Sequence, residues 1–354
     1  MGEPQAPGAP RRGARKLDHL RLALAPASSG AGWEDVHLVH DSLPEAALDQ
    51  VDLRTRLLGL ELPRPIIVNA MTGGVAEAAV INRALGRLAA DLGLAVAVGS
   101  QRAALEDPAL ARTYAAVREE NRDGVVLANL GAGASPAEAR QAIAMIGANA
   151  LQLHLNAPQE LQMAEGDRDF RGRLEAVAAV VASGVPVLVK ECGFGMSAET
   201  ARRLHAVGVR AVDVGGRGGT NFARIERQRS ADEAGADPGL LDWGIPTAAS
   251  LLEVVGAGLP GLEVVASGGV RWGSEAARAL ALGACAVGVA GPVWRALHRD
   301  GQEGARRYLL GLLNDLGTTA LLTGATTLAR LWAAPVVLTG QVLAWAEQRG
   351  IRRP

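Results

Sequence analysis

Eight short runs of β-branched and other apolar residues recur through the middle of the chain, each bounded by glycine, proline, asparagine or serine. The runs are PIIVNAM (65–71), AVAVGS (95–100), VVLANL (125–130), ALQLHLN (150–156), VPVLVKE (185–191), AVDVGG (211–216), EVVASGG (263–269) and AVGVAG (286–291). Segments with helical spacing separate them, such as Ile81, Leu85, Leu88 and Leu92. Because parallel strands need long crossovers, the pattern predicts an α/β fold of the (β/α)8 TIM-barrel type.

The spacing of these runs also predicts the domain organisation. The sixth and seventh runs begin at residues 211 and 263, farther apart than any other neighbours, so residues 217–262 form an insertion at the active face. Residues 1–14 are rich in proline, alanine, glycine and arginine and are expected to be a flexible tail. We therefore expect one barrel domain over 15–354, with an N-terminal extension and C-terminal helices.

Composition narrows the function classes. A formal net charge of −1 over 354 residues argues against a nucleic-acid or membrane-surface binder, which usually carries a basic excess. Two cysteines cannot form a disulfide scaffold, and no apolar run reaches the ~20 residues of a membrane-spanning helix. A cytoplasmic protein with a small-molecule ligand is the simplest expectation.

Polar residues and glycines gather where the predicted strands end, which is where barrel enzymes carry their chemistry. The polar ones are Asn69, Thr72, Ser100, Arg102, Asn129, His154, Asn156, Lys190, Asp213, Thr220, Ser267 and Arg271. Along the fourth strand, Gln152, His154 and Asn156 share one face. His154 alone is equally well explained as a satisfied core histidine, but with Asn156, Gln159 and Glu160 nearby a ligand site is favoured.

Three features suggest an anionic ligand. Glu160 is expected either to complement a helix dipole or to hold Mg²⁺ beside a substrate phosphate. Gly268-Gly269 and Ala290-Gly291 follow the last two strands, where barrels commonly bind phosphate, and Arg271 adds charge. Lys190, one of only two lysines, either pairs with Glu191 or Asp213 or faces an anionic cofactor.

Taken in order, the motifs resemble the type 2 isopentenyl-diphosphate δ-isomerases, a family of FMN-dependent (β/α)8 barrels. The matching stretches are RKLDH (15–19), NAMTGG (69–74), GSQR (99–102), ANLGA (128–132), QLHLNAPQE (152–160), EGDRDFRG (165–172), VKECGFGMS (189–197), DVGGRGGTNFARIE (213–226), DWGIPTAAS (242–250), SGGVRWG (267–273) and ALALGA (279–284). The resemblance extends from about residue 15 to residue 291, whereas 227–241 and the tails do not map onto the pattern.

The resemblance implies interconversion of isopentenyl and dimethylallyl diphosphates by a 1,3-proton shift, in isoprenoid biosynthesis. It implies reduced FMN as the acid/base cofactor, NADPH as the reductant, a requirement for Mg²⁺, and a homotetramer or larger homo-oligomer. It implies catalytic roles for Gln159, His154 and Lys190.

The same resemblance assigns binding residues by motif. The implied flavin contacts are Ala70, Met71, Thr72, Ser100, Asn129, Lys190 and Thr220, with the phosphate held by Gly269, Arg271, Ala290 and Gly291. The implied substrate contacts are Arg15, Lys16, His19, Arg102, His154, Asn156 and Gln159, with Glu160 as the metal ligand.

Two other classes of function share parts of this pattern. An FMN oxidoreductase acting on 2-hydroxy acids or nucleotides needs a catalytic His/Arg pair or a loop cysteine, yet residues 217–262 contain neither histidine nor cysteine. A non-catalytic flavin or phosphate sensor would not require His154, Asn156, Gln159 and Glu160 to converge.

Overall fold

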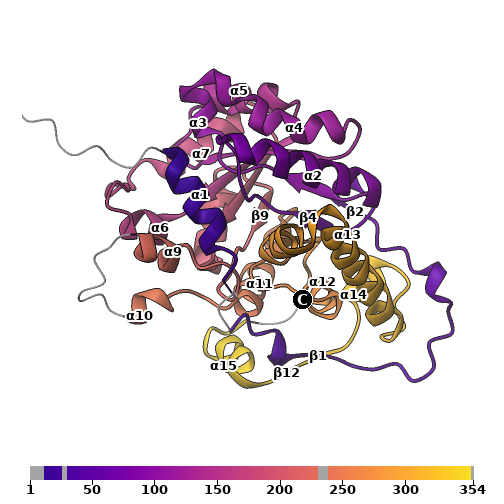
Figure 1. Cartoon of the computed structure of the whole chain (residues 1–354). Helices are drawn as coiled ribbons and strands as arrows, with labels where there is room; N and C mark the ends of the chain where they lie inside the picture. Colours follow the sequence, from indigo (N-terminus) through magenta and orange to yellow (C-terminus); the bar gives the residue numbers. More distant parts are fainter. Residues whose placement is uncertain (1–11, 26–29, 230–237, 352–354) are drawn as a thin grey trace, which may run out of the picture.

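The computed structural model describes residues 12–25, 30–229 and 238–351. Eight parallel strands close into a barrel in the order β10-β11-β4-β5-β6-β7-β8-β9, and helices surround it (Figure 1). The strands are β4 (Ile66–Val68), β5 (Ala95–Ala97), β6 (Val126–Gly131), β7 (Ala150–Leu155), β8 (Val187–Glu191), β9 (Ala211–Asp213), β10 (Glu263–Ser267) and β11 (Ala286–Val289). The predicted fold class is confirmed, and each of the eight runs overlaps one barrel strand, with β6 extending one residue past its run to Gly131.

Several strands end earlier than the apolar runs that predicted them. For example, β9 ends at Asp213, and Gly215 then takes a φ of 47°, which lies outside the extended region. An added Cβ at Gly215 would lie only 1.9 Å from the carbonyl oxygen of Glu191. The residues just beyond the strands therefore form the loops at the carboxyl end of the barrel, because their backbone leaves the sheet.

The helices that follow the strands are α2 (Ala76–Leu92), α3 (Arg102–Glu106), α4 (Arg112–Glu120), α5 (Pro136–Ile146), α6 (Ala157–Gln162), α7 (Arg173–Ala182), α8 (Ala198–Ala206), α9 (Phe222–Arg229), α10 (Pro238–Leu241), α11 (Thr247–Gly256), α12 (Gly273–Ala281) and α13 (Gly291–Leu321). The insertion expected at 217–262 contributes α9, α10 and α11, with 230–237 outside the described residues. Among the described helices, none combines the length and apolar character needed to cross a bilayer.

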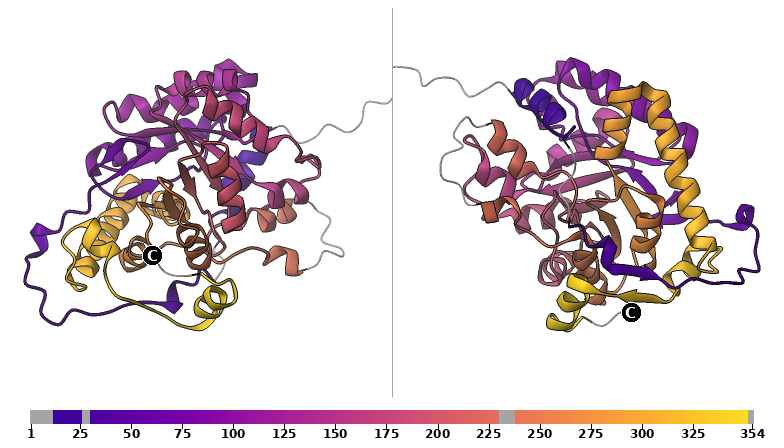
Figure 2. Two further views of the ribbon diagram at one scale, coloured as in Figure 1. Left: turned by 180° about the vertical axis from the view of Figure 1, so that it is seen from behind. Right: turned by 60° about the horizontal axis from the view of Figure 1, so that its bottom comes forward.

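The described segments nearest the two termini pack beside the barrel. Helix α1 (Arg12–Leu22) begins within the stretch predicted to be a flexible tail, and residues 1–11 lie outside the described residues. Strand β1 (Val36–Leu38) pairs antiparallel with β12 (Val336–Leu338). Along the chain, β12 lies between α14 (Leu328–Trp332) and α15 (Gly340–Gln348). The views in Figure 2 show these two distant segments side by side.

The barrel interior has an apolar lower layer and a polar upper layer. Buried side chains such as Ile67, Leu127 and Leu188 pack with Leu57 and Leu62. The latter two belong to a hairpin of β2 (Thr55–Leu57) and β3 (Leu60–Leu62). Toward the carboxyl ends, the buried side chains are polar, namely Asn69, Asn129, Gln152, Lys190, Asp213 and Ser267. A ligand inside the barrel can therefore contact polar groups only at the carboxyl end of the strands, because aliphatic side chains fill the amino end.

Helix α13 bends at Gly301, where φ is 66°, and its second half packs against α12. Leu309, Leu312 and Leu316 form an apolar stripe on α13 and are buried there. Gly273 lies at the contact, since an added Cβ would be 2.2 Å from the Leu316 nitrogen and 2.3 Å from the Leu312 carbonyl oxygen. The stripe thus holds α13 to the barrel of its own chain.

Replacing Gly273 with alanine is expected to lower the free energy of unfolding by about 3 kcal/mol, because backbone atoms of α13 cannot yield as a flexible side chain would. Urea denaturation measures the change. Gly311→Ala in α13 is the matched control, since nothing lies within 4 Å of its added Cβ. That variant is expected to gain roughly 0.5–1 kcal/mol. Equal stability of the two variants would contradict the close contact between α12 and α13.

Candidate active site

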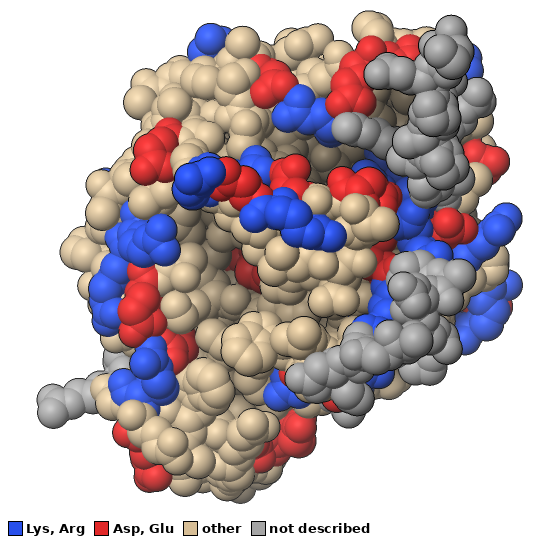
Figure 3. Space-filling model, turned by 90° about the vertical axis from the view of Figure 1, so that its left-hand side faces the viewer, with Lys and Arg blue, Asp and Glu red and all other residues tan. Residues whose placement is uncertain are grey.

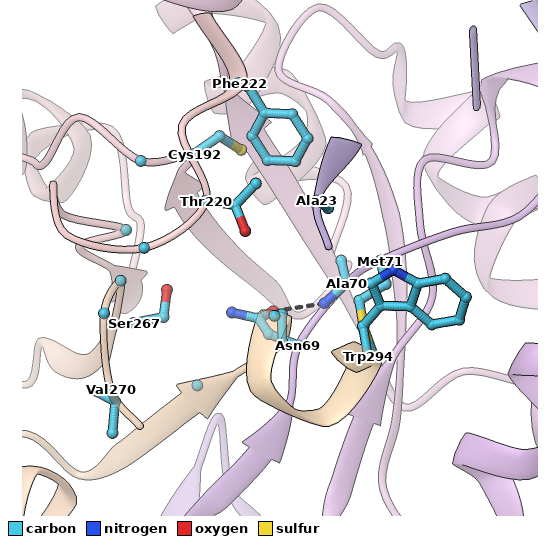
Figure 4. A pocket seen from close by; sticks show the side chains of 18 of the residues that line it. Ala23, Asn69, Ala70, Met71, Cys192, Thr220, Phe222, Ser267, Val270 and Trp294 are labelled. Carbon is cyan, nitrogen blue, oxygen red and sulfur yellow. Dashed lines mark hydrogen bonds between the residues drawn. The ribbon is translucent and has the colours of Figure 1, made fainter. Parts of the chain in front are cut away.

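A cleft opens at the carboxyl ends of the barrel strands (Figure 4). Its walls come from the loops after β4, β8, β9, β10 and β11 and from α1 and α13. Figure 4 shows the Thr220 hydroxyl directed into the cleft and Asn69 at its floor. The face of the molecule that carries α1, α6 and α9 is hollowed in Figure 3, with mainly uncharged residues around the hollow and charges of both signs farther out.

One end of the cleft is suited to a phosphate. Helix α13 begins there at Gly291, and no side chain caps its N-terminus. In contrast, the backbone nitrogens of Arg271 and Trp272, at the start of α12, donate to the Glu275 carboxylate at 2.7 and 3.2 Å. Unsatisfied N–H groups at a helix N-terminus favour an anion, so the open start of α13 is the better phosphate site.

Two arginines add positive charge at the same end. Arg271 donates to Glu275 at 2.8 Å through Nη2, but its buried Nε has no hydrogen-bond partner in the structure. Arg295 lies one turn into α13, and an added Cβ at Gly291 would be 3.1 Å from its guanidinium. No carboxylate within the described ranges pairs with Arg295, and burial, together with the charge of Arg271, lowers its pKa. An anionic ligand would neutralise this pair.

The opposite wall carries a buried group of ionisable side chains. Lys190 Nζ donates to the Glu191 carbonyl oxygen at 3.0 Å and lies 3.8 Å from Cys192 Sγ. Burial opposes its charge, yet Cys192, Asp213 and Glu191 outweigh burial and raise the pKa of Lys190. Burial raises the pKa of Glu191 to about 8, even though its carboxylate accepts hydrogen bonds from the backbone of Phe194 and Gly195. Lys190 therefore stays cationic at the edge of the cleft.

Glu226 gathers three groups at the rim of the cleft. Its Oε1 lies 2.6 Å from His19 Nε2 and accepts a hydrogen bond from Gln159 Nε2 at 2.8 Å, while Arg229 Nη1 donates to Oε2. Burial would raise the pKa of this carboxyl group, but His19, Gln159 and Arg229 lower it to about 2. One buried carboxylate thus joins α1, α6 and α9.

Lys16 fastens α1 to the loops after β4 and β5. Its Nζ donates to the carbonyl oxygens of Gly73 and Ser100, the latter at 3.2 Å, and lies 2.6 Å from the Tyr114 hydroxyl. The ammonium group also lies 5.1 Å from the centre of the Tyr114 ring. Helix α1 is therefore held over the end of the barrel by its own charged side chain.

His154 stands at the end of β7, above the buried polar layer. Its Nδ1 lies 2.9 Å from Asn129 Oδ1. Burial and the nearby charges of Lys190 and Arg173 lower the pKa of His154 to about 4, against a backbone hydrogen bond at Leu130 that raises it. The ring is therefore neutral at pH 7.

Glu160 lies in α6 and already has hydrogen-bond donors. Asn156 Nδ2 donates to Oε1 at 2.7 Å, and the backbone nitrogen of Asp167 donates to Oε2 at 3.1 Å. Within the described part of the chain, no group of three or more His, Cys, Asp or Glu side chains could hold a metal ion. A site with one carboxylate suits Mg²⁺ only if substrate phosphates and water supply the other ligands.

The predicted site residues fall into two groups. Those that line the cleft are His19, Ala70, Met71, Lys190, Thr220, Gly269, Arg271, Ala290 and Gly291. Those outside its lining are Arg15, Lys16, Thr72, Ser100, Arg102, Asn129, His154, Asn156, Gln159 and Glu160. Among the second group, Arg15 lies 3.5 Å from Glu165, Arg102 pairs with Glu138, and the buried Thr72 Oγ1 has no hydrogen-bond partner in the structure.

Sequence reasoning missed two residues of the site. Glu226 ends a stretch that matched the family pattern, but nothing in the spacing indicated that His19, Gln159 and Arg229 would meet it. Arg295 follows Gly291 by one helical turn, and a cation at that place after the last strand was a usable signal for phosphate binding.

The closed barrel, with a cleft suited to phosphate at its carboxyl end, defines the class to which this chain belongs, the (β/α)8 barrels. A family model described as FMN-dependent dehydrogenase matches residues 162–337. Within that class the chain belongs to the isopentenyl-diphosphate delta-isomerase family. It is 56% identical to the isopentenyl-diphosphate delta-isomerase of Symbiobacterium thermophilum over 95% of both chains. It is 52% identical to that of Moorella thermoacetica over 96% of this chain and 97% of the relative.

Solved structures support the fold alone. A mandelate oxidase variant with (S)-mandelic acid superposes with a TM-score of 0.64 at 23% identity, covering 92% of this chain and 94% of the other. A protein described as a lactate oxidase, from Pediococcus acidilactici, gives a TM-score of 0.68 at 17% identity, covering 92% and 93%.

The residues of the cleft fit FMN. The uncapped start of α13, the unpartnered Arg271 Nε and Arg295 suit its phosphate. Gly268 and Gly269 have φ values of 107° and 73°, and an added Cβ at either would collide with the loop after β9. The loops after β9 and β10 can therefore pack closely only because positions 268 and 269 are glycine. This side of the cleft is lined by backbone rather than by side chains.

Proposed function

We propose that this protein interconverts isopentenyl diphosphate and dimethylallyl diphosphate by a 1,3-proton shift, using FMN reduced by NADPH, together with Mg²⁺. The proposal rests on the 56% and 52% sequence identity, over nearly the full length of the chain, with relatives named for that isomerisation. Reduced FMN, when bound, supplies an acid/base group and an electron-rich ring beside the alkene.

We assign the two phosphate-bearing ligands, FMN and the diphosphate substrate, to two different parts of the site. Gly269, Arg271, Ala290 and Gly291 hold the flavin phosphate, with Arg295 as an added cation. Lys190 would supply a cation to the flavin ring, and Ala70, Met71 and Thr220 line the same cleft. The remaining flavin contacts proposed from the motifs are Thr72, Ser100 and Asn129. This division leaves the rim under α1 for the substrate.

At the rim, the proposed substrate contacts are Arg15, Lys16, His19, Arg102, His154, Asn156 and Gln159. His19 and Gln159 are supported most directly, because both are bonded to Glu226 beside the cleft. The Glu226 carboxylate orients both the Gln159 amide and the His19 ring. In this role Gln159 positions the reacting end of the substrate or passes a proton, and Gln159→Ala is expected to lose turnover.

One assay separates the isomerase from the other two classes of function. The purified protein is supplied anaerobically with FMN, NADPH, Mg²⁺ and isopentenyl diphosphate, and product and NADPH are both measured. Formation of dimethylallyl diphosphate without stoichiometric loss of NADPH is expected. Steady consumption of NADPH or oxygen with another substrate would favour an oxidoreductase, and flavin binding without any reaction would favour a sensor.

Replacing Glu160 with glutamine is expected to abolish the rise in rate on adding Mg²⁺, because the amide keeps the shape of the carboxylate but loses the charge that the cation needs. Rates are measured across a Mg²⁺ titration. Glu175→Gln on the exposed face of α7 is the matched control and keeps the normal response. An unchanged Mg²⁺ response in Glu160→Gln would rule out the proposed metal ligand.

The proposal also includes a homo-oligomeric state and a cytoplasmic location for the protein. A homotetramer or larger oligomer is supported by large apolar side chains left exposed, including Val80, Trp272 and Trp332. A cytoplasmic location is supported by the free thiols of Cys192 and Cys285. Light scattering coupled to size-exclusion chromatography tests the assembly.

A further inference from the structure

A line of buried side-chain amides crosses the upper layer of the barrel. It runs from Asp213 through Asn69, Gln152 and Asn129 to His154, so it joins strands that are not neighbours in the barrel. We call the three side-chain amides of Asn69, Gln152 and Asn129 the amide chain. Asp213 and Gln152 are 0% exposed, and Asn129 and Asn69 are 3% and 5% exposed, so water cannot easily replace these hydrogen bonds.

Each bond of the amide chain points the same way. Asn69 Nδ2 donates to Asp213 Oδ2 at 2.8 Å, and Gln152 Nε2 donates to Asn69 Oδ1 at 2.9 Å. Asn129 Nδ2 donates to Gln152 Oε1 at 3.0 Å. Asn129 therefore presents its oxygen, an acceptor, to His154 Nδ1 at 2.9 Å.

Two groups at the Asp213 end fix this direction. Asp213 Oδ1 accepts from the Ser267 hydroxyl at 2.6 Å and from the Gly215 nitrogen at 3.1 Å, which suits a carboxylate that can only accept. The Ala70 nitrogen, which can only donate, lies 3.0 Å from Asn69 Oδ1 (Figure 4, dashed line). Reversing the chain would set the Asn69 oxygen against Asp213 and the Asn69 NH₂ group against the Ala70 N–H.

We infer that Asp213, acting through the amide chain, fixes His154 as the Nδ1–H tautomer, so that Nε2 is a hydrogen-bond acceptor. Asp213, Asn69 and Gln152 are thus positioning residues. Nε2 lies next to Gly131, where an added Cβ would be 3.6 Å away. Burial of the ring, together with the positive charges of Lys190 and Arg173, lowers the pKa of His154 and keeps the ring neutral.

This assignment limits what His154 can bind. A neutral ring with a bare Nε2 accepts a hydrogen bond from a hydroxyl group or from a water held by Mg²⁺. It cannot donate to an ionised phosphate oxygen through Nε2 unless it first takes up a proton. The inference deepens the proposed function by specifying the hydrogen-bonding role of His154 toward that substrate.

Ring-nitrogen NMR of the FMN-loaded protein with ¹⁵N-labelled histidine tests the inference. The protein has six histidines, and His154→Gln identifies the signals of His154. At pH 7 the wild-type ring is expected in the Nδ1–H form in at least a roughly tenfold excess, because the reversed chain would leave buried polar groups unpaired. A dominant Nε2–H form would overturn the inference.

Gln152→Met breaks the amide chain in the middle while keeping the volume of the side chain. Asn129 is then free to turn, and a mixture of both His154 tautomers is expected. Gln101→Met is the matched control, because Gln101 is also 0% exposed and bonds Asn129, but through the Asn129 backbone nitrogen, at 3.0 Å. A single Nδ1–H tautomer in Gln152→Met would overturn the role of the amide chain.

A second variant, Asn129→Asp, tests the same inference if Gln152→Met does not fold. Asn129→Asp can only accept, so it is expected to retain the Nδ1–H form while its negative charge moves the protonation of Nε2 to higher pH. An Nε2–H form in this variant would overturn the inference. These readouts do not depend on turnover, so failure of the isomerase assay and failure of this inference are distinguishable.

Discussion

Replacing Glu226 with glutamine is expected to lower kcat/KM for isopentenyl diphosphate roughly 100-fold, because it removes the charge of a buried, hydrogen-bonded carboxylate. Arg229 then relies on its longer contacts with Asp18 at 3.5 Å and Glu165 at 3.7 Å. The side chain of Glu226 is 0% exposed, and that of Arg229 is 9% exposed. His19, which lines the cleft, loses its anion as well. Steady-state kinetics with saturating FMN and Mg²⁺ measure the loss.

The pH dependence of stability checks the same carboxylate independently of activity. Its pKa is lowered to about 2 in the folded protein, so it stabilises the fold above its ordinary pKa, and this contribution is lost as the pH falls toward 2. The wild type is therefore expected to be more stable than Glu226→Gln at pH 7, with the difference shrinking below about pH 4.5. Thermal unfolding at a series of pH values measures it.

The matched control for Glu226 is Glu61→Gln. Glu61 pairs with Arg56 on the exposed β2–β3 hairpin, with side chains 59% and 72% exposed, so its loss is expected to change little. If Glu226→Gln behaved like Glu61→Gln in both kinetics and stability, the contacts that the Glu226 carboxylate makes with α1, α6 and α9 would contribute to neither activity nor stability.

Replacing Lys190 with methionine is expected to weaken FMN binding by about 100-fold or more. The change removes a cation from the wall of the cleft and leaves the fully buried Asp213 without its positive neighbour. Arginine is not expected to restore binding, because a planar guanidinium does not fit a site built for a compact ammonium. Fluorescence titration with oxidised FMN measures the affinity.

Unfolding of the FMN-free protein must be followed in parallel, since Lys190→Met also destabilises the fold through Asp213. Arg299→Met is the matched control, because that side chain is 76% exposed and pairs with its neighbour Asp300. FMN affinity within about threefold of the wild type in Lys190→Met would exclude Lys190 from the flavin site.

The barrel and its carboxyl-end chemistry were predictable because their signals are local. Strand periodicity placed Gln152 and His154 on one face of β7, and the structure directs both into the upper layer of the barrel. The glycines after β10 and the open helix start after β11 likewise follow from residues close together in the chain. A period of two, or a turn that only glycine adopts, requires no knowledge of distant segments.

Tertiary structure alone decided which side chains meet. His19 and Glu226 are separated by 207 positions in the chain, and Asn69 and Asp213 by 144. No local pattern could pair them, because closure of the barrel, and the placement of α1 over its end, bring them within hydrogen-bond distance. The direction of the amide chain is likewise a property of the closed barrel, since Asn and Gln can each bond either way until an aspartate and a backbone N–H fix the order.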